Sequence, residues 1–432
     1  MRLFVSALEY SANIHLRYLL SEIAKLDSVE ICGIFDEKIL DFTRKSGDSS
    51  DFEYCGDSAF CDSFGGADSK RGDSACVDSS DDKDCGDFSR GDSAILHTIS
   101  GKSICNVDSI AVMGFIDVLK KMRFFINLNK TSLSLALQAD KILLMDSSSF
   151  NIPLAKRIKK RNQRKKIAYY ILPQVWAWKP WRAKAIEKNC DILAAILPFE
   201  VQCYKKKAKF AGHPLLDEIR YFKNCDSSKA VESSDFADSS DLNKGDSNIF
   251  AFMPGSRKAE IERIFPVFIE VKDYLKKRFP NASFHLIIPQ KFKGSDLWAI
   301  YENLDDFIIS FDAHKSLFYS KFAFICSGTA TLECALIGTP FVLGYKCRAI
   351  EAFIARRFLN IKYIGLANLL YEKIRQDETF HIELVQEDLN VKNLINAFES
   401  AKESEFIEKS LRLRAYLKNG SAKAVARWLY DL

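Results

Sequence analysis

Short apolar runs alternate with amphipathic segments along most of the chain, beginning at its first residues. An apolar run at residues 2–6 predicts a buried strand, and a second run at residues 29–35 predicts another. Between them, apolar residues at helical spacing predict a helix over about residues 13–26. A strand, a helix and a strand in this order are typical of a βαβ unit with two parallel strands.

The same alternation continues through the sequence and restarts once. Further strands are expected at residues 141–145, 166–172, 192–197, 249–253, 283–288, 307–311, 322–326 and 341–343. With helices between most of them, this order predicts an α/β fold of two Rossmann-like, doubly wound domains. We place these domains at residues 1–222 and 248–432, joined by residues 223–247, with the C-terminal helix able to pack back on the first domain. A central cleft is expected between them, because open α/β sheets bind ligands at the carboxyl ends of their strands.

Composition narrows the class of protein. Of the 432 residues, 47% are hydrophobic and 28% are charged, which is close to the globular average and excludes collagen-like or wholly disordered chains. No run of about 18 uncharged apolar residues and no apolar signal region is present, so we expect a cytoplasmic protein that does not span a membrane. The twelve cysteines are dispersed without a CxxC pair. We therefore expect reduced thiols, no bound metal and no cofactor.

Two acidic tracts lower the net charge of a chain whose other residues are strongly basic. Residues 46–93 repeat Gly-Asp-Ser and Asp-Ser-Ser units and carry thirteen acidic against four basic side chains, and residues 226–247 carry six against two. The remaining 362 residues therefore have a formal charge of +18, although the whole chain has only +5. A body this basic favours phosphorylated ligands, nucleic acid or an anionic membrane surface as partners. The tracts contain few large apolar residues, so we expect solvated surface insertions.

Two strand–loop–helix junctions in the second half predict a site for phosphate groups. One loop follows residues 249–253 and the other follows residues 322–326, and each places backbone N–H groups at the start of a helix. Each loop taken alone is also consistent with an ordinary helix cap. As a pair in one domain they favour a nucleotide site, with a guanidinium for the pyrophosphate and a carboxylate for the ribose diol. The candidate residues are Gly255, Ser256, Arg257, Ser327, Gly328, Thr329 and Glu333.

Two carboxylates of the first half are candidates for acid–base chemistry. Asp146 follows the strand predicted at residues 141–145, and Glu9 follows the first strand. A carboxylate at the carboxyl end of a parallel strand is well placed to take a proton from an alcohol inside a cleft. The structural alternatives are a helix cap for Asp146 and a first-turn acid that complements the helix dipole for Glu9.

An aromatic and cationic cluster and a lone histidine stand near the end of the first domain. Residues 174–182 contain Trp176, Trp178 and a third tryptophan together with two cations. Such a cluster can stack on bases, line a sugar or lipid pocket, or pack between domains. His213 either supports the local structure or donates a hydrogen bond to a phosphate from the cleft.

The segment over residues 110–128 is unusually apolar, with Phe115, Met122 and Phe125 among its large side chains. Basic residues accompany it, and more follow at residues 156–166. An apolar face with a basic border favours contact with an anionic membrane surface. The alternative is a core helix beside a solvated basic helix.

Taken together, the motifs resemble the family of lipid-A-disaccharide synthases. The matching stretches are SALEYSAN (6–13), VMGF (112–115), MD (145–146), FN (150–151), VWAW (175–178), LPFE (197–200), GHP (212–214), PGSR (254–257), SGTATLE (327–333) and LANLL (366–370). They follow the family's order and span almost the whole chain outside the acidic tracts. Asn13 and Ser149 depart from the family pattern, since each replaces an aspartate.

The resemblance implies the two-domain GT-B glycosyltransferase fold and a metal-independent enzyme of lipid A biosynthesis in Gram-negative bacteria. It implies transfer of 2,3-diacylglucosamine from its UDP derivative to 2,3-diacylglucosamine 1-phosphate, with inversion to a β-1,6 link and release of UDP. By matching motifs, the family's catalytic aspartate is Asp146, its functional N-terminal glutamate is Glu9, its phosphate-region arginine is Arg257, and a functional asparagine is Asn368. The apolar segment would receive acyl chains at the cytoplasmic face of the inner membrane.

Other functions stay open from the sequence. One alternative is another UDP-sugar GT-B transferase, such as the one that adds N-acetylglucosamine to a peptidoglycan precursor. The other is a non-catalytic membrane-surface scaffold derived from a transferase. We expect the two acylated sugars and an anionic membrane surface as partners and no nucleic acid, and a homodimer is left open.

Overall fold

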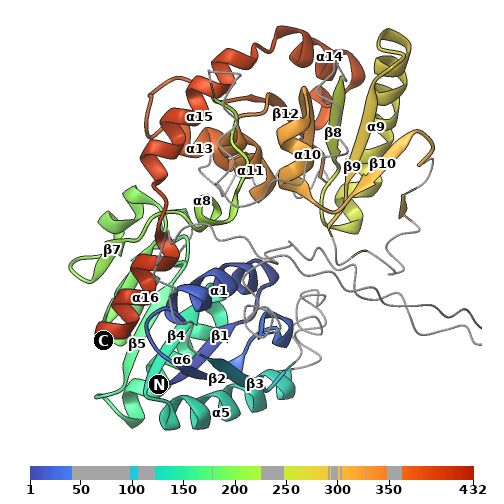
Figure 1. Cartoon of the computed structure of the whole chain (residues 1–432). Coiled ribbons are helices and arrows are strands. Elements are labelled where there is room, and N and C mark those ends of the chain that lie inside the picture. Colours follow the sequence, from blue (N-terminus) through green and yellow to red (C-terminus); the bar gives the residue numbers. More distant parts are fainter. Residues whose placement is uncertain are drawn as a thin grey trace, which may run out of the picture.

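Two parallel sheets flanked by helices make up the protein (Figure 1). The computed structural model describes residues 1–40, 98–105, 122–177, 179–224, 248–289, 292, 300–301, 304–326, 328–347 and 362–432. Both acidic tracts lie outside the described residues, as do Phe115, Trp178, Ser327 and the side chain of Met122. No helix in the described part of the chain is long and apolar enough to cross a bilayer.

The first sheet forms the first lobe, drawn from blue to green in Figure 1. Its seven parallel strands lie in the order β3 (Ile99–Ser103), β2 (Val29–Ile34), β1 (Arg2–Ala7), β4 (Lys141–Met145), β5 (Lys166–Tyr170), β6 (Ile192–Ala195) and β7 (Ala208–Phe210). Its main helices are α1 (Tyr10–Ile23), α5 (Met122–Gln138), α6 (Ser148–Arg161) and α7 (Arg182–Asn189). The central strands are buried on both faces, which explains their continuous apolar runs.

The second sheet forms the second lobe and has six parallel strands. Their order is β10 (Phe307–Ser310), β9 (Ser283–Ile287), β8 (Ile249–Met253), β11 (Phe322–Cys326), β12 (Phe341–Tyr345) and β13 (Ile382–Val385). Around them lie α9 (Lys258–Arg278), α10 (Ala313–Tyr319), α11 (Thr329–Ile337), α13 (Leu366–Tyr371), α14 (Val391–Ser400) and α15 (Glu403–Leu417). Stacked phenylalanines fill this core, with the rings of Phe252 and Phe324 centred 5.0 Å apart.

The predicted α/β class with two Rossmann-like sheets is confirmed, while the sequence missed three strands. These strands are β3, β7 and β13, and each lies at the edge of its sheet. An edge strand pairs on one side only and is shorter or more polar, so its apolar pattern is weak. The prediction therefore succeeded for the buried strands and for the edge strand β10, whose pattern FIIS is apolar, and failed at the other three edges.

The final helix returns to the first lobe after the second lobe is complete. This helix, α16 (Ser421–Asp431), contributes Val425, Ala426 and Leu429 to the core that contains Leu3 and Val5. Figure 1 shows it lying against the lower lobe. The first sheet therefore completes its apolar cover with residues that follow the second lobe in the sequence.

Polar contacts fix α16 in this position. Asp217, in the short helix α8 (Pro214–Glu218), accepts hydrogen bonds from the backbone N–H groups of Gly420 and Ala422 at 2.5 and 2.8 Å. The Lys141 ammonium donates to the carbonyls of Leu429 and Tyr430 at 2.7 and 2.5 Å. A carboxylate thus caps the start of α16 and a cation caps its end, as the helix dipole favours.

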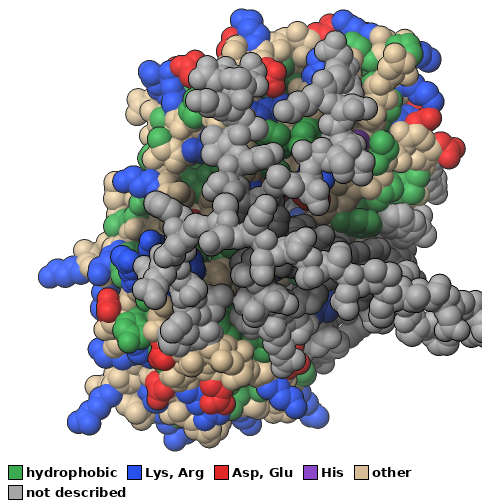
Figure 2. Space-filling model, in the orientation of Figure 1, with side chains coloured by type: hydrophobic (Ala, Val, Ile, Leu, Met, Phe, Trp, Pro, Cys, Tyr) green, Lys and Arg blue, Asp and Glu red, His purple; other side chains and the backbone are tan. Residues whose placement is uncertain are grey.

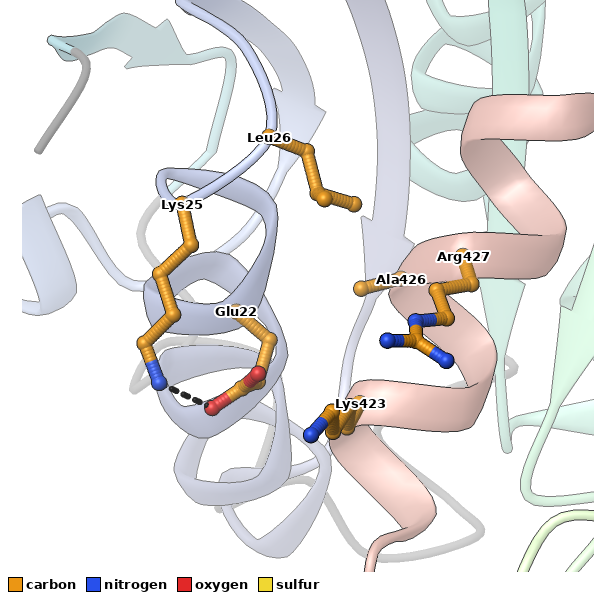
Figure 3. Close-up of a pocket in the computed structure, with 6 residues that line it drawn as sticks. All are labelled: Glu22, Lys25, Leu26, Lys423, Ala426 and Arg427. Carbon is orange, nitrogen blue, oxygen red and sulfur yellow. Dashed lines mark hydrogen bonds and ion pairs between the residues drawn. The ribbon is translucent and has the colours of Figure 1, made fainter. Parts of the chain in front are cut away.

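A shallow hollow of about 170 Å³ opens where α16 packs against α1 (Figure 3). Its lining residues are Glu22, Lys25, Leu26, Lys423, Ala426 and Arg427. The ammonium of Lys25 is paired with the Glu22 carboxylate at 2.5 Å. The hollow lies at the carboxyl end of α1, whereas Glu9 lies at the amino end of this helix. It is therefore separate from the candidate active site.

Replacing Asp217 with alanine should loosen α16. Two N–H groups at the helix start would lose their acceptor, so we expect the free energy of unfolding to fall by about 1–2 kcal/mol. For a chain of this length, the melting temperature should fall by about 1 °C for each kcal/mol. The control is Glu387→Ala, at an exposed second-lobe carboxylate. Equal melting temperatures for the two variants would contradict the capping role.

Candidate active site

A strained turn presents Asp146 at the carboxyl end of β4. Asp146 and Ser147 have φ angles of 48° and 37°, a left-handed conformation that is costly for residues other than glycine. The buried amide of Asn151 donates to the carbonyl of Asp146 at 3.0 Å, and the Tyr169 hydroxyl donates to the same oxygen at 2.5 Å. Ser6 in turn donates to Asn151 Oδ1 at 2.7 Å. Neighbouring strands thus hold a turn that the local chain would not adopt by itself.

Glu9 and Asp146 are neighbours because β1 and β4 are adjacent parallel strands. The Ser147 hydroxyl donates to Glu9 Oε1 at 3.4 Å and so links the two strand ends. Burial raises the pKa of the Asp146 carboxyl, while the Ser147 backbone N–H and the charge of His15 lower it in part. Burial also raises the pKa of Glu9, and the charge of Asp146 raises it further. Two carboxylates that share a site in this way suit proton transfer.

A buried histidine–carboxylate pair lies beside them. His15 on α1 donates through Nδ1 to Glu218 on α8, and their side chains are only 13% and 6% exposed. The charge of His15 also acts on Glu333, whose pKa is raised by burial and lowered in part by His314 and then His15. Glu333 belongs to α11 of the second lobe. The pair of His15 and Glu218 therefore lies close enough to influence the start of α11 as well as the Asp146 carboxyl.

The first phosphate-site candidate follows β8. Gly255 has φ 119°, and a Cβ atom there would lie 3.1 Å from the Glu260 carboxylate and 3.2 Å from Cys326 Sγ, so only glycine fits without displacement. Arg257 precedes α9 and donates to Glu260 Oε1 at 2.7 Å, a bond that raises the pKa of the guanidinium. The arginine side chain is otherwise 79% exposed. One edge of the Arg257 guanidinium is thus hydrogen-bonded to Glu260, and its other N–H groups face solvent.

The second phosphate-site candidate follows β11, the neighbour of β8 in the sheet. Gly328 has φ 139°, and no atom lies within 4 Å of a Cβ position built on it. Thr329 begins α11 and is exposed, as is Ser256 in the first loop. The predicted loops are therefore adjacent, and two helix starts with exposed polar groups lie side by side. Such starts attract anions.

Asn368 is buried and its side-chain amide is fully engaged. Its Nδ2 donates to the carbonyl of His381 at 3.0 Å and to Glu383 at 2.8 Å. Its Oδ1 accepts from the backbone N–H groups of Phe380 and His381 at 2.7 and 3.0 Å. An amide offers two donor hydrogens and two acceptor lone pairs, and all four are used here. The geometry gives Asn368 the role of joining the start of α13 to β13.

Trp176 and His213 occupy structural positions near the junction of the lobes. The Trp176 ring packs edge-on against Phe199 at 5.3 Å and contacts the apolar core of the second lobe. His213 is buried, and its Nδ1 accepts from the backbone N–H of Leu215 at 3.3 Å, which caps α8. Burial lowers the pKa of His213 to about 3, so the ring is neutral at physiological pH. The structural alternative for each residue therefore matches its contacts.

The described part of the apolar segment has two sides. Phe125 is partly buried against the core of the first lobe, and Leu128 is fully part of it. Phe124 and Ile126 instead expose 39% and 48% of their surface. The beginning of α5 therefore packs on the sheet and also presents apolar side chains to the outside.

The supporting roles of four residues were missed by sequence reasoning, although Asn151 stood in the matching stretch FN (150–151). Asn151, Glu260, His15 and Glu218 act through contacts between elements, and only Glu260 has a local signal, as the residue three positions after Arg257. In the described ranges no three histidine, cysteine or acidic side chains gather in a way that could hold a metal ion. The described side chains of the site are carboxylates, hydrogen-bond donors and cations.

Comparison with known proteins connects this geometry to a family. The sequence profile of a family described as lipid-A-disaccharide synthetase matches residues 94–426. A lipid-A-disaccharide synthase of Helicobacter acinonychis is 52% identical over 324 residues, which cover 73% of this chain and 84% of that protein. The Campylobacter jejuni lipid-A-disaccharide synthase is 38% identical over 378 residues, covering 81% and 93%.

Solved structures with low sequence identity share the fold. The glycosyltransferase SnogD of Streptomyces nogalater superposes with a TM-score of 0.53 at 12% identity, covering 100% of this chain and 99% of that chain. A glycotransferase of kitacinnamycin gives a TM-score of 0.51 at 10% identity, covering 100% and 98%. These similarities confirm the predicted two-domain GT-B arrangement.

Replacing Asn368 with alanine should destabilise the second lobe. Buried backbone groups of Phe380 and His381 would lose their partners, so we expect the free energy of unfolding to fall by about 2–4 kcal/mol. The measurement is urea unfolding, with the exposed Asn419→Ala as the matched control. If the variant lost UDP affinity but unfolded like the control, Asn368 would contact the nucleotide directly.

Proposed function

Because this chain belongs to the lipid-A-disaccharide synthetase family, we propose that it joins two 2,3-diacylglucosamine units. The donor is the UDP derivative and the acceptor is the 1-phosphate, which receives the sugar on its 6-hydroxyl in a β-1,6 link. The chain is a glycosyltransferase of lipid A biosynthesis with the GT-B fold. The observation that carries the proposal is Asp146, a partly buried carboxylate on a strained turn at the carboxyl end of β4, beside Glu9.

In the proposed reaction, Asp146 takes the proton of the acceptor 6-hydroxyl while that oxygen attacks the anomeric carbon of the donor. The bond from the anomeric carbon to the UDP oxygen breaks on the opposite side, so the configuration inverts. A buried carboxylate with a raised pKa is a stronger base than an exposed one, which suits this role. Glu9, held by Ser147, would orient the acceptor.

The leaving group gains negative charge as the bond breaks. Arg257 and the adjacent starts of α9 and α11 are the described groups of the second lobe that suit the pyrophosphate. The tether to Glu260 fixes the arginine fork before substrate arrives, so little reorganisation is needed. Glu333 would accept hydrogen bonds from the ribose diol. Electrostatic stabilisation of this kind performs the task that a metal ion performs in other transferases.

We also propose contact with an anionic membrane surface, which both lipid substrates require. Exposed Phe124 and Ile126 on α5 supply an apolar contact. Exposed cations follow on α6, in the next loop and at the first residue of β5: Lys156, Arg157, Lys160, Arg161, Arg164 and Lys166. Figure 2 shows Lys and Arg side chains along the border of the lower lobe. Apolar side chains with nearby cations are suited to a headgroup region.

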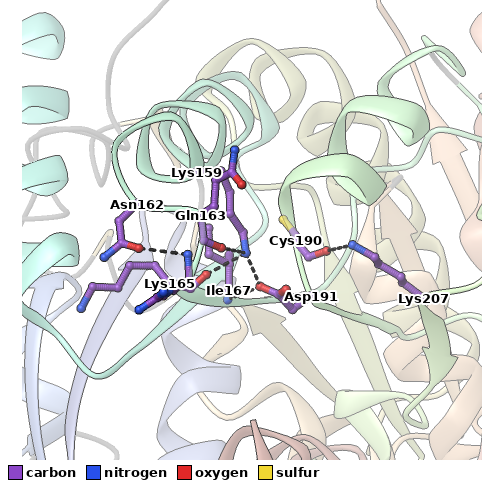
Figure 4. Close-up of polar contacts among 9 residues, drawn as sticks. Lys159, Asn162, Gln163, Lys165, Ile167, Cys190, Asp191 and Lys207 are labelled. Atoms are coloured by element: carbon purple, nitrogen blue, oxygen red, sulfur yellow. Dashed lines mark hydrogen bonds and ion pairs between the residues drawn. The ribbon is translucent and has the colours of Figure 1, made fainter.

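Two other cations of this region, Lys159 and Lys165, stabilise the fold instead (Figure 4). The Lys159 ammonium donates to Asp191 and to the carbonyl of Lys165, both at 2.7 Å. The ammonium of Lys165 donates to the carbonyl of Ala139. These contacts bind the end of α6 to the neighbouring strands, so neither side chain is assigned to the membrane surface.

Incubation of the protein with the two acylated sugars should release UDP and form the disaccharide. In that assay we expect Asp146→Asn to lose about 10²–10⁴-fold in turnover while it still binds UDP, because only the base is removed. Asp377→Asn is the matched control, since Asp377 also has a positive φ and is exposed. Near-normal turnover of Asp146→Asn would refute the role of the base, and turnover of non-acylated UDP-N-acetylglucosamine would favour the peptidoglycan alternative.

The same variant has a second readout in stability. Because the folded-state pKa of Asp146 is raised above its ordinary 3.8, ionisation costs folding free energy as the pH rises through that folded-state pKa. Asp146→Asn should therefore unfold at a higher urea concentration than the wild type at pH 7, with the difference shrinking toward pH 3. A variant less stable than the wild type at pH 7 would contradict the burial of this charge.

Replacing Phe124 and Ile126 together with serine should weaken binding to vesicles that contain anionic lipid. Loss of exposed apolar contacts should lower the bound fraction at least several-fold in a sedimentation assay. The matched control is Ile308→Ser, an apolar residue of β10 that is 52% exposed. Equal binding by both variants would show that α5 is not the membrane contact.

A further inference from the structure

Arg182 is hydrogen-bonded to a residue just after the turn of the proposed base, although it comes from a different element. It begins α7, and its Nη1 donates to Ser148 Oγ at 2.7 Å. Ser148 begins α6 and follows Asp146 by two residues, a span of at most about 7 Å along the backbone. The guanidinium is therefore anchored to the start of the helix that follows the turn of Asp146.

The charges of this region create a problem for an anionic acceptor. Glu9 and Asp146 both bring negative charge to the strand ends, and a sugar phosphate would be repelled by them. A cation on the same side would offset this repulsion. His15 is engaged with the carboxylate of Glu218, so its charge is largely compensated.

The side-chain contact of Arg182 leaves its positive charge available for a ligand. The partner it contacts is a neutral hydroxyl, and in the part of the chain that the structure describes no carboxylate lies within 4.0 Å of its guanidinium. Its side chain is half-buried, which limits screening by solvent. A guanidinium offers five N–H donors in a planar fork, so four remain for a ligand. This fork matches the oxygen atoms of a phosphate monoester.

Two consecutive serines after Asp146 contact side chains of opposite charge. Ser147 contacts Glu9 on one side, and Ser148 contacts Arg182 on the other. A hexose carries its anomeric phosphate and its 6-hydroxyl at different ends of the molecule. An acceptor with its hydroxyl at Asp146 therefore has its phosphate directed away from the carboxylates.

We propose that Arg182 binds the phosphate group of the sugar 1-phosphate acceptor and thereby selects phosphorylated over unphosphorylated sugars. This inference rests on the proposed function, and it assigns a subsite within the same cleft. It separates the two anionic substrates by lobe, with the acceptor phosphate at Arg182 and the donor pyrophosphate at Arg257. Arg182 is accordingly a specificity-determining residue, and Asp146 remains the base.

The test compares two acceptors, 2,3-diacylglucosamine 1-phosphate and the same sugar without its phosphate. Arg182→Gln should lower kcat/KM for the phosphorylated acceptor by about 10- to 100-fold, because one charge-assisted contact is lost. Its effect on the unphosphorylated acceptor and on the KM of the donor should stay below about twofold. Arg182→Lys should recover part of the loss, since it keeps the charge but not the fork. Arg375→Gln, at an exposed second-lobe arginine, is the matched control.

Equal losses for both acceptors would overturn the proposal and leave Arg182 a support for the start of α6. A raised KM for the donor would overturn it as well. Calorimetric titration of the wild type and Arg182→Gln with the phosphorylated acceptor needs no turnover. If the wild type made no disaccharide yet bound this acceptor more than tenfold tighter than Arg182→Gln, the proposed function would fail while the phosphate subsite stood. Equal affinities would overturn the subsite.

Discussion

Parallel pairing of neighbouring strands is the constraint from which the candidate site follows. Because β1 and β4 run in the same direction, their carboxyl ends stop at one edge of the sheet and bring Glu9 beside Asp146, 137 positions later in the chain. The same rule in the second lobe places the loops after β8 and β11 next to each other. Buried side chains then fix the backbone conformation of the loops at the strand ends. Asn151 and Tyr169 do this for the turn of Asp146. Backbone strain concentrated at such a turn is common at functional sites.

The junction of the lobes is polar as well as apolar. Apolar side chains from both lobes share one core, in which Leu197 and Leu215 pack with Ala251 and Ile287. The pair of His15 and Glu218 is buried beside it and influences carboxylates in both lobes. A buried polar pair of this kind costs more solvation energy than an apolar pair, so its presence here is better explained by the chemistry it surrounds than by stability.

Much of the fold and part of the site could be predicted from the sequence, for reasons that particular residues illustrate. Buried strands such as β4 and β11 were predicted to the residue, since both of their faces are apolar. Asp146 and Gly255 were found because strand ends and glycines leave local signals. The engagement of Asn368 and the burial of His213 could not be predicted, because their partners depend on how α13 and α8 pack. Arg182 was noticed only as one cation in an aromatic cluster, since its contact with Ser148 joins two separate helices.

The position of α16 has a consequence for how the chain acquires its structure during synthesis. The first sheet is translated before the second, yet one of its faces is covered by Val425 and Leu429. While the ribosome is still making the second lobe, α1 already covers part of that face, and the part that α16 covers is still open. The first domain therefore cannot complete its apolar core before the second lobe has been synthesised, unlike a domain that folds as a unit while the next one is still being made.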